Sequence, residues 1–574
     1  MSYLSAKYST EENNIDLLIE ASEKNLEITD YFQYAYKKVY YQSLIKKIFS
    51  EFKHLQNYNG FNIESDRKRF TELDKKINNL HTKDLIQSLL NRKPPPGIRR
   101  GLVRDYTEMG LINHITQGER RKVPSIRKLL ERAGDAIREL KPFFMMSPHS
   151  VAQFLPPKGI EFDLILIDEA SQLKPEFALG ALARSKRAVI MGDPMQMPPS
   201  TTFERDIDID EEDEDVQTID EKSILDVALT KFEARRDLKW HYRSRDESLI
   251  AFSNKEFYND RLIIFPNSFV STDHLGIKVN KINAFYQGKT NRDEAIETKN
   301  KICEFMKKFP NRSCLAVTMN IQQAELIQSL VDDEERKDQD ISDYIGKWEG
   351  TLEPFTVKNL ERVQGDERDC IFISTLFGPP DENTPTAQRF GPINTQYGYR
   401  RLNVLFTRAK ERIEVITSMN PNDIKFNEGV ATGGSSYGRK VLSDYLHYGK
   451  TGQLYSGEDS DREIGSDFQL FVGNKLKEKG YEIKQEIGVK GFFIDIGVKH
   501  PKYPNKYLIG IECDGATYHS SKSARDRDRL RQEILEGLGW TIYRIWSTDW
   551  FNNSENETSK LVKFIEDKAK ESLN

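Results

Sequence analysis

The chain opens with apolar and aromatic residues at helical spacing. From residue 11 to about residue 92 they recur every three or four positions, as in IDLLIEASEKNL, YFQYAYKKVYYQSLIKKIFSEF and DRKRFTELDKKINNL, with a turn at YNGFN. Three prolines at 94–96 end this pattern, and a basic stretch leads from there to a different one. We therefore predict a helical module over residues 1–140.

The pattern changes at Pro142, where short apolar runs begin to alternate with amphipathic segments. The runs are FFMMS, FDLILID, AVIMGD, SCLAVT, CIFISTLF and RIEVITS. Runs of this length between loops are typical of parallel strands that crossover helices cover on both faces. The sequence therefore predicts an α/β fold, which we divide into residues 141–235 and 236–432.

A shift in composition marks the end of this region. Residues 433–462 are rich in Gly, Ser and acidic residues, which predicts a linker. A compact unit over residues 463–574 follows, in the order helix, strand, hairpin, helix, strand. Its main segments are DFQLFVGNKLKEKG, GFFIDIGV, KYLIGIECDG, ARDRDRLRQEILEGLG and WTIYRIWS.

Composition narrows the class of protein. The 574 residues, 37% of them hydrophobic and 30% charged, are enough for several domains with their own cores. No apolar run reaches the length of about 18 residues that a membrane helix needs, and the polar start lacks the regions of a signal peptide. We expect a cytoplasmic protein without membrane contact. The four cysteines show no metal or disulfide spacing, so we expect reduced, buried thiols.

The charge is unevenly distributed. The net charge is −5, but the segment Glu204–Glu221 alone carries −10, which leaves +5 for the rest. A block of like charges is typical of a solvated loop. The mildly basic remainder permits nucleic-acid binding without establishing it.

Two acidic or polar turns follow neighbouring predicted strands. Asp168 and Glu169 end FDLILIDEASQ, and Gly192, Asp193 and Gln196 follow RAVIM in GDPMQMPP. The carboxyl ends of parallel strands are where such sheets bind ligands, and an acid there can hold Mg2+ while its neighbour orients an attacking water. Gln196 would sense the terminal phosphate. Taken singly, each segment also fits a plain strand-end turn.

A third polar turn precedes the buried run CIFIS. It contains Gln364, Gly365 and Glu367 in VQGDERD, where glycine allows close backbone approach. A tight surface turn is the alternative for this segment.

Together these segments resemble the motifs of superfamily 1 (Upf1-like) helicases. DEASQ, GDPMQMPP, WHYRSRDESLIAFSN, VKNLERVQGDERDCIFIS and RRLNVLFTRAKERI correspond to motifs II to VI in order, and MSP-S-VAQFL precedes them. The resemblance implies RecA-like domains, the first one incomplete, over 141–235 and 236–432, with the helical module as a stalk or insertion. It also implies that Arg243 and Arg408 reach the transferred phosphate, a role that suits a permanently charged guanidinium.

A phosphate-binding loop, G-x-x-x-x-G-K-[ST], is missing from the sequence. Gly288-Lys289-Thr290 would need glycine at Asn283, and Gly449-Lys450-Thr451 would need it at Asp444. In the family this loop lies upstream of the helical module. Another protein subunit could supply it to complete an ATP site, the chain could be a truncated gene product, or the motor could be a nucleotide-independent scaffold.

The compact C-terminal unit carries clustered acids. Asp495 lies on one predicted strand, while Glu512 and Asp514 lie two apart on the next and hence on one face. Carboxylates that converge across a hairpin suit Mg2+ or Mn2+, which can activate water for phosphodiester cleavage. His519 could act as general acid or base, or be structural. The arginines at 525, 527, 529 and 531 could contact phosphates or form surface ion pairs.

IECDGATYHSSKSARDRDR and LGWTIYRIWSTDWF resemble the very-short-patch-repair-like branch of PD-(D/E)xK endonucleases. Asp514 replaces the common lysine of that pattern, and Gln469 stands where related domains often have Glu. We therefore expect a helicase or translocase subunit joined to a metal-dependent endonuclease that acts on single- or double-stranded DNA, in bacterial defence. The alternatives are an ATP-independent DNA-binding scaffold that presents the nuclease, and an RNA-directed helicase.

Overall fold

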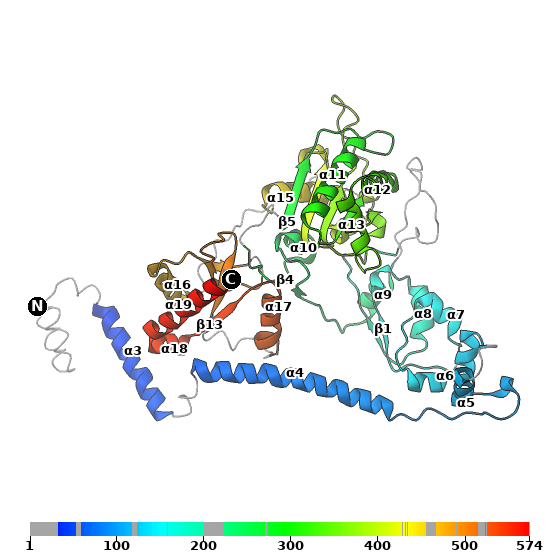
Figure 1. The fold of residues 1–574 in the computed structure, drawn as a ribbon, viewed down its shortest axis with the longest axis horizontal. Coiled ribbons are helices and arrows are strands. Elements are labelled where there is room, and N and C mark those ends of the chain that lie inside the picture. The colour runs from blue at the N-terminus through cyan, green and yellow to red at the C-terminus, as the bar shows by residue number, and fades with distance from the viewer. Residues whose placement is uncertain are drawn as a thin grey trace, which may run out of the picture.

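A computed structural model gives the structure of the protein, shown in Figure 1. It describes residues 32–52, 59–117, 123–157, 159–199, 222–269, 274–427, 429–430, 432, 434, 436–454, 466–488, 491–514, 523 and 525–572. The acidic segment 204–221 lies outside these residues. None of the helices within them is both long and apolar enough to span a membrane. All four cysteines are free and buried, as the sequence predicts.

The N-terminal part is helical, as predicted. The helix α4 (Gly60–Leu90), which we call the helical arm, begins at Asn59, whose side chain accepts a hydrogen bond from the amide of Asn62. Its end lies just before the three prolines, which cannot continue a helix. The remaining helices of this part are α3 (Phe32–Glu51), η3 (Val103–Asp105), α5 (Glu108–Gln117) and α6 (Ile126–Leu140).

The first α/β unit, residues 141–231, contains a sheet of two parallel strands in its described part. These are β1 (Ile165–Ile167) and β2 (Ala188–Ile190), paired through Leu166 and Val189. The run FFMMS, expected as a strand, is a loop, because its side chains alternate between half-buried and exposed with no strand beside them. The helices are α7 (Pro148–Phe154), η4 (Ala170–Gln172), α8 (Pro175–Leu182) and α9 (Ile224–Lys231).

The second α/β unit, residues 236–454, contains a five-stranded parallel sheet in the order β5-β9-β8-β6-β7. Alternate residues of each strand pack against helices on opposite faces, which explains the continuous apolar runs. Its sheet strands are β5 (Gly276–Lys281), β6 (Cys314–Thr318), β7 (Val357–Asn359), β8 (Arg368–Ser374) and β9 (Ala409–Thr417).

Helices cover both faces of this sheet. α11 (Arg292–Lys308), α12 (Ile321–Glu335) and α13 (Gln339–Trp348) pack on one face. α10 (Ser248–Tyr258), α14 (Gly398–Phe406) and α15 (Tyr437–Thr451) pack on the other. The smaller elements are β3 (Trp240–His241), β4 (Ile263–Ile264), η6 (Leu360–Arg362), η7 (Gly391–Asn394) and η8 (Pro421–Asp423).

Helix α15 differs from the linker expected over 433–462. Its side chains Val441, Tyr445 and Leu446 are buried, and the Tyr445 ring stacks on Phe406 with centroids 3.5 Å apart. The Gly and Ser residues that suggested a linker flank this helix, whose apolar residues at helical spacing place it in the core of the second α/β unit.

The C-terminal unit, residues 466–572, has the predicted order of elements. Its four-stranded sheet runs β10-β11-β12-β13, with the expected antiparallel hairpin β11-β12 followed by a parallel pair. The strands are β10 (Ile483–Ile487), β11 (Ile494–Lys499), β12 (Tyr507–Asp514) and β13 (Ile542–Trp546). The helices are α16 (Asp467–Glu478), a π-helical turn (Asp526–Leu530), α17 (Arg531–Gly537), α18 (Ser547–Asn552) and α19 (Ser554–Glu571).

The helical arm runs from the C-terminal unit to the α5 and α6 helices beside the first α/β unit (Figure 1). The C-terminal unit also packs against the start of the second α/β unit. There Trp540 Nε1 donates to the carbonyl oxygen of Pro266 at 2.8 Å, and Phe265 packs in an apolar core with Phe492. The C-terminal unit therefore contacts both the arm and the second α/β unit.

Candidate nucleotide cleft and nuclease site

Asp168 and Glu169 follow β1 directly and are exposed. The backbone amide of Glu169 donates to Asp168 Oδ1 at 3.0 Å. Glu169 adopts a left-handed conformation with φ of 50°. This conformation is costly for a residue with a Cβ, and such residues cluster at functional sites. The turn therefore holds both carboxylates beyond the end of the strand.

The loop after β2 is fixed by the second α/β unit. Asp193 Oδ2 accepts a hydrogen bond of 2.6 Å from the Tyr258 hydroxyl, and Asn403 Nδ2 donates to the carbonyl oxygen of Met195 at 2.9 Å. Met197 packs into the core of the second unit. Gly192 lies close to the turn after β1, since a Cβ there would lie 3.1 Å from the amide nitrogen of Ser171. The loop thus connects the two units.

Side-chain contacts join the predicted residues across the two units. Gln364 Nε2 donates to Glu169 Oε2 at 3.2 Å and lies 3.4 Å from Gln196 Oε1. Arg408 Nη2 lies 3.5 Å from the same Gln196 oxygen. Arg408 is 5% exposed, and burial lowers the pKa of its guanidinium. A buried cation that faces a carboxylate across a domain boundary is placed to bind an anion between the units.

Arg243 and Glu367 form an ion pair of 2.9 Å at the same boundary. The neighbouring Gly365 has φ of 89°, the left-handed region that favours glycine. Both side chains of the pair are about two-fifths exposed, so the pair contributes little to stability and can exchange partners. A phosphate could therefore replace Glu367 as the partner of Arg243.

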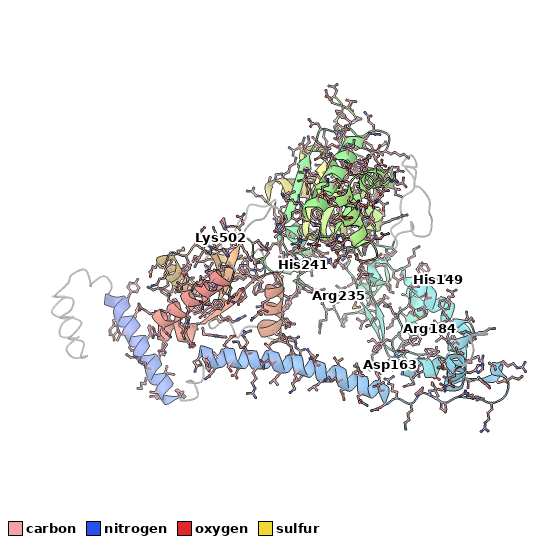
Figure 2. The ribbon with its side chains drawn as sticks, in the orientation of Figure 1. His149, Asp163, Arg184, Arg235, His241 and Lys502 are labelled. Carbon is pink, nitrogen blue, oxygen red and sulfur yellow. The ribbon has the colours of Figure 1, made fainter. Side chains whose placement is uncertain are left out.

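A cleft of about 510 Å³ lies next to these residues. His149 on α7, labelled in Figure 2, and Lys174 line it from the first α/β unit. Arg362, Gln364 and Arg401 line it from the second. Glu361 also lines the cleft and pairs with Arg401 at 2.6 Å, so Lys174 and Arg362 are the cations that could face an anionic ligand between the units.

In the C-terminal unit, Asp495 is held by two donors. Gln469 Nε2 donates to its Oδ1 at 2.5 Å, and the amide of Cys513 donates to its Oδ2 at 2.6 Å. Burial, together with the nearby charge of Glu512, raises the pKa of Asp495 to about 7. Gln469 is buried on α16 and therefore orients the Asp495 carboxylate.

Glu512 and Asp514 lie on β12 beside a cation that sequence reasoning missed. Arg544 pairs with Glu512 in the register of β12 and β13, and its Nη1 lies 3.6 Å from Glu512 and 2.5 Å from Asp514. Burial raises the pKa of Glu512, whereas the charge of Arg544 lowers it. A single arginine within an apolar strand was the signal available in the sequence.

Among the described residues of this unit, Asp495 and Glu512 are the side chains that fit a divalent cation. In the described part of the chain, no three acidic, His or Cys side chains are arranged as a metal site, and Asp514 points to Arg544 instead. The Glu512 Oε1 atom is buried without a hydrogen-bond partner, and the register of β11 and β12 sets Asp495 opposite Glu512. Two half-buried carboxylates of this kind fit Mg2+, which prefers oxygen ligands. His519 lies outside the described residues.

Tyr258 and Asn403 hold the loop after β2 against the second α/β unit, and the sequence analysis missed both. Burial and the charge of Asp193 raise the pKa of the Tyr258 hydroxyl, which therefore stays protonated and donates. Neither residue lies in a turn or shows a local signal, because each acts through a contact with a distant segment.

Two families match the chain. Residues 221–420 match a family described as an AAA domain, and residues 468–565 match a family of restriction-endonuclease-like domains. These matches confirm the resemblance found in the motifs, and the second covers Asp495, Glu512 and Asp514.

Three curated relatives extend the comparison. An uncharacterised ATP-dependent helicase of Mycoplasma pneumoniae is 30% identical over 456 residues, which are 74% of this chain and 38% of that protein. One from Mycoplasma genitalium is 28% identical over 450 residues, 74% and 39% of the two chains. A DNA replication ATP-dependent helicase/nuclease of Gallus gallus is 25% identical over 259 residues, 45% and 23%. The chain thus spans about two-fifths of the length of the Mycoplasma relatives.

Proposed function

The chain carries an AAA domain of the superfamily 1 helicase type followed by a restriction-endonuclease-like domain, and we propose that it is a helicase or translocase subunit that cuts DNA with Mg2+ or Mn2+. The half-buried pair Asp495 and Glu512 carries the nuclease part of this proposal. The contacts of Glu169, Gln364, Gln196 and Arg408 across the two α/β units support the motor part.

In the proposed nuclease reaction, Asp495 and Glu512 hold the cation. The cation supplies a more acidic water and stabilises charge on the phosphate. Gln469 and the Cys513 amide keep Asp495 in one orientation through their hydrogen bonds. Arg544 holds Asp514 and provides a positive charge beside Glu512, at the strand position where it can balance charge on the cleaved phosphodiester. We propose that His519 takes part as general acid or base.

The first test is cleavage of supercoiled plasmid DNA by the purified chain. We expect nicking or cutting that requires Mg2+ or Mn2+ and does not change with ATP, because Asp495 and Glu512 lie in the C-terminal unit whereas the residues of the cleft lie in the two α/β units. Chelation of the metal by EDTA should stop it. Cutting that persists in EDTA would contradict the metal-dependent mechanism, and equal cleavage of RNA would contradict the choice of DNA.

We further propose that a partner chain supplies the phosphate-binding loop. The sheet of the first α/β unit supports this, because only one of its faces is covered in the described residues. Leu166 and Val189 on the other face are 60% and 43% exposed. Parallel strands are normally buried on both faces, so this face suits a further layer that carries the loop.

Nucleotide binding tests the partner proposal. We expect the chain alone to bind a fluorescent ATP analogue only weakly, because amides and a lysine that cradle phosphates are missing from its 574 residues. Addition of a polypeptide that contains the loop should confer binding, and Arg408→Ala should then slow hydrolysis on the order of a thousandfold. Tight binding by the chain alone would contradict the need for a partner, and binding without hydrolysis in the complex would favour the scaffold function.

Foreign DNA is the target that we propose. The resemblance of the motifs to bacterial helicase-like proteins with a terminal endonuclease supports this choice, since such an enzyme can act on DNA that enters the cell.

A further inference from the structure

The helical arm places one buried carboxylate on the C-terminal unit. Asp74 is 7% exposed although most of the arm around it is open to solvent. Arg525 Nε lies 3.0 Å from both Asp74 oxygens, and Arg529 forms an ion pair with the same carboxylate. The hydrogen bond from Arg525 lowers the pKa of Asp74, which is therefore an anion. Two guanidinium groups around one anion are an arrangement that also binds phosphate.

A second contact joins the arm to the segment that follows the acidic strand β12. Arg67 of the arm donates to Gln532 Oε1 at 2.6 Å, one helical turn beyond Arg529. The arm therefore contacts both the π-helical turn and α17 of the C-terminal unit.

The arm also fits this surface closely at its start. The amide of Gly60 donates to both oxygens of Asp549, at 3.0 and 3.1 Å. A Cβ at Gly60 would lie 2.5 Å from Cδ1 of Trp546, the residue that pairs with Asp514 in the sheet. A side chain larger than hydrogen would thus push the arm away from the nuclease.

We propose that Arg525 and Arg529 form a phosphate-binding site for the DNA strand that the nuclease cuts, and that Asp74 occupies this site as a carboxylate in place of the phosphate. Asp74 and a backbone phosphate each bring one negative charge to the same two guanidinium groups, so the helical arm and DNA compete. The site rests on the proposed nuclease function for its substrate, and the arm regulates access to it.

The test measures binding of a short fluorescein-labelled DNA duplex to the full chain in EDTA, where no cutting takes place. Asp74→Ala should tighten binding about tenfold. A plot of log affinity against log salt concentration should also become steeper by about 2, the value expected for two additional phosphate contacts. Gly60→Val should give a gain in the same direction, because it displaces the arm while Asp74 remains. Asp84→Ala is the matched control, since Asp84 is an exposed acid on the same helix.

Substitution of both arginines tests whether they form the phosphate site. In the Asp74→Ala background, Arg525→Gln with Arg529→Gln should abolish the gain. A gain in DNA affinity that survives this double change would overturn the proposal. Unchanged DNA affinity in both Asp74→Ala and Gly60→Val would also overturn it, and the ion pairs of Asp74 would then only attach the arm to the C-terminal unit. Because binding is read without cleavage, a chain that shows this gain but never cuts DNA would refute the proposed nuclease activity and leave the phosphate site standing.

Discussion

Glu512→Gln is expected to slow metal-dependent DNA cleavage about a thousandfold, the scale on which the loss of one electrostatic contact to a transition state acts. Glutamine keeps the size of the side chain and removes the charge that holds the cation. Glu512 is the carboxylate with a buried oxygen that lacks a hydrogen-bond partner, and its second oxygen lies 3.6 Å from Arg544. Initial rates of plasmid nicking at saturating Mg2+ provide the measurement.

Glu566→Gln serves as the control for this change. Glu566 is an exposed acid on α19 of the same unit, and its loss should leave the nicking rate unchanged. Thermal unfolding of both variants shows whether the unit still folds, as we expect, because Asp514 remains as a partner of Arg544. A Glu512→Gln protein that folds and cuts at the parent rate would refute the role of Glu512 as a metal ligand.

In the parent chain, the free energy of unfolding is expected to fall by about 3 kcal/mol as the pH rises from about 4.5 to about 7. Glu294→Gln should abolish this fall. Burial raises the pKa of Glu294 from 4.5 to about 7 in the folded chain. Over that interval the unfolded chain releases the proton while the folded chain keeps it. The free energy of unfolding therefore decreases as pH rises. Above pH 7 the contribution of Glu294 to it no longer changes.

The surroundings of Glu294 allow this substitution. Its Oε1 accepts hydrogen bonds from the Ser374 hydroxyl and the Leu376 amide, at 2.7 and 2.6 Å, which a glutamine oxygen can keep. Its Oε2 lies 3.2 Å from the Ser418 hydroxyl, which can also accept, and 3.4 Å from the donor Asn291 Nδ2, whose weak hydrogen bond the glutamine loses. Urea unfolding of the parent and the variant at several pH values gives the comparison, with the exposed Glu325→Gln on α12 as control. Equal pH dependence in parent and Glu294→Gln would show that Glu294 ionises normally in the fold.

Local sequence patterns predicted the elements that carry the acids. Asp168 follows a strand and Glu512 lies on one, and both strands show in the spacing of apolar residues. The α/β class and the hairpin of the C-terminal unit followed in the same way. The loop FFMMS and the helix α15 were exceptions, because a short apolar run without periodicity and a helix flanked by Gly and Ser give ambiguous signals.

Contacts between distant segments could not be predicted. Arg525 meets Asp74 across 451 residues of sequence, and Arg544 meets Glu512 through the register of two strands. A single sequence gives the character of each side chain but contains no information on register or docking. The same limit hid the contact of Asp514 with Arg544, the arginine that also lies beside Glu512.

Three contacts connect the units of the protein in a ring (Figure 1). Asp193 and Tyr258 join the two α/β units, Pro266 and Trp540 join the second of them to the C-terminal unit, and the helical arm leads back to the first. In a closed ring, rotation at one joint requires rotation at another. The joint at Trp540 is apolar and buried, whereas the joint of the arm consists of charged groups that ions screen. We therefore expect the contact between the arm and the C-terminal unit to be the first of the three to weaken as ionic strength rises.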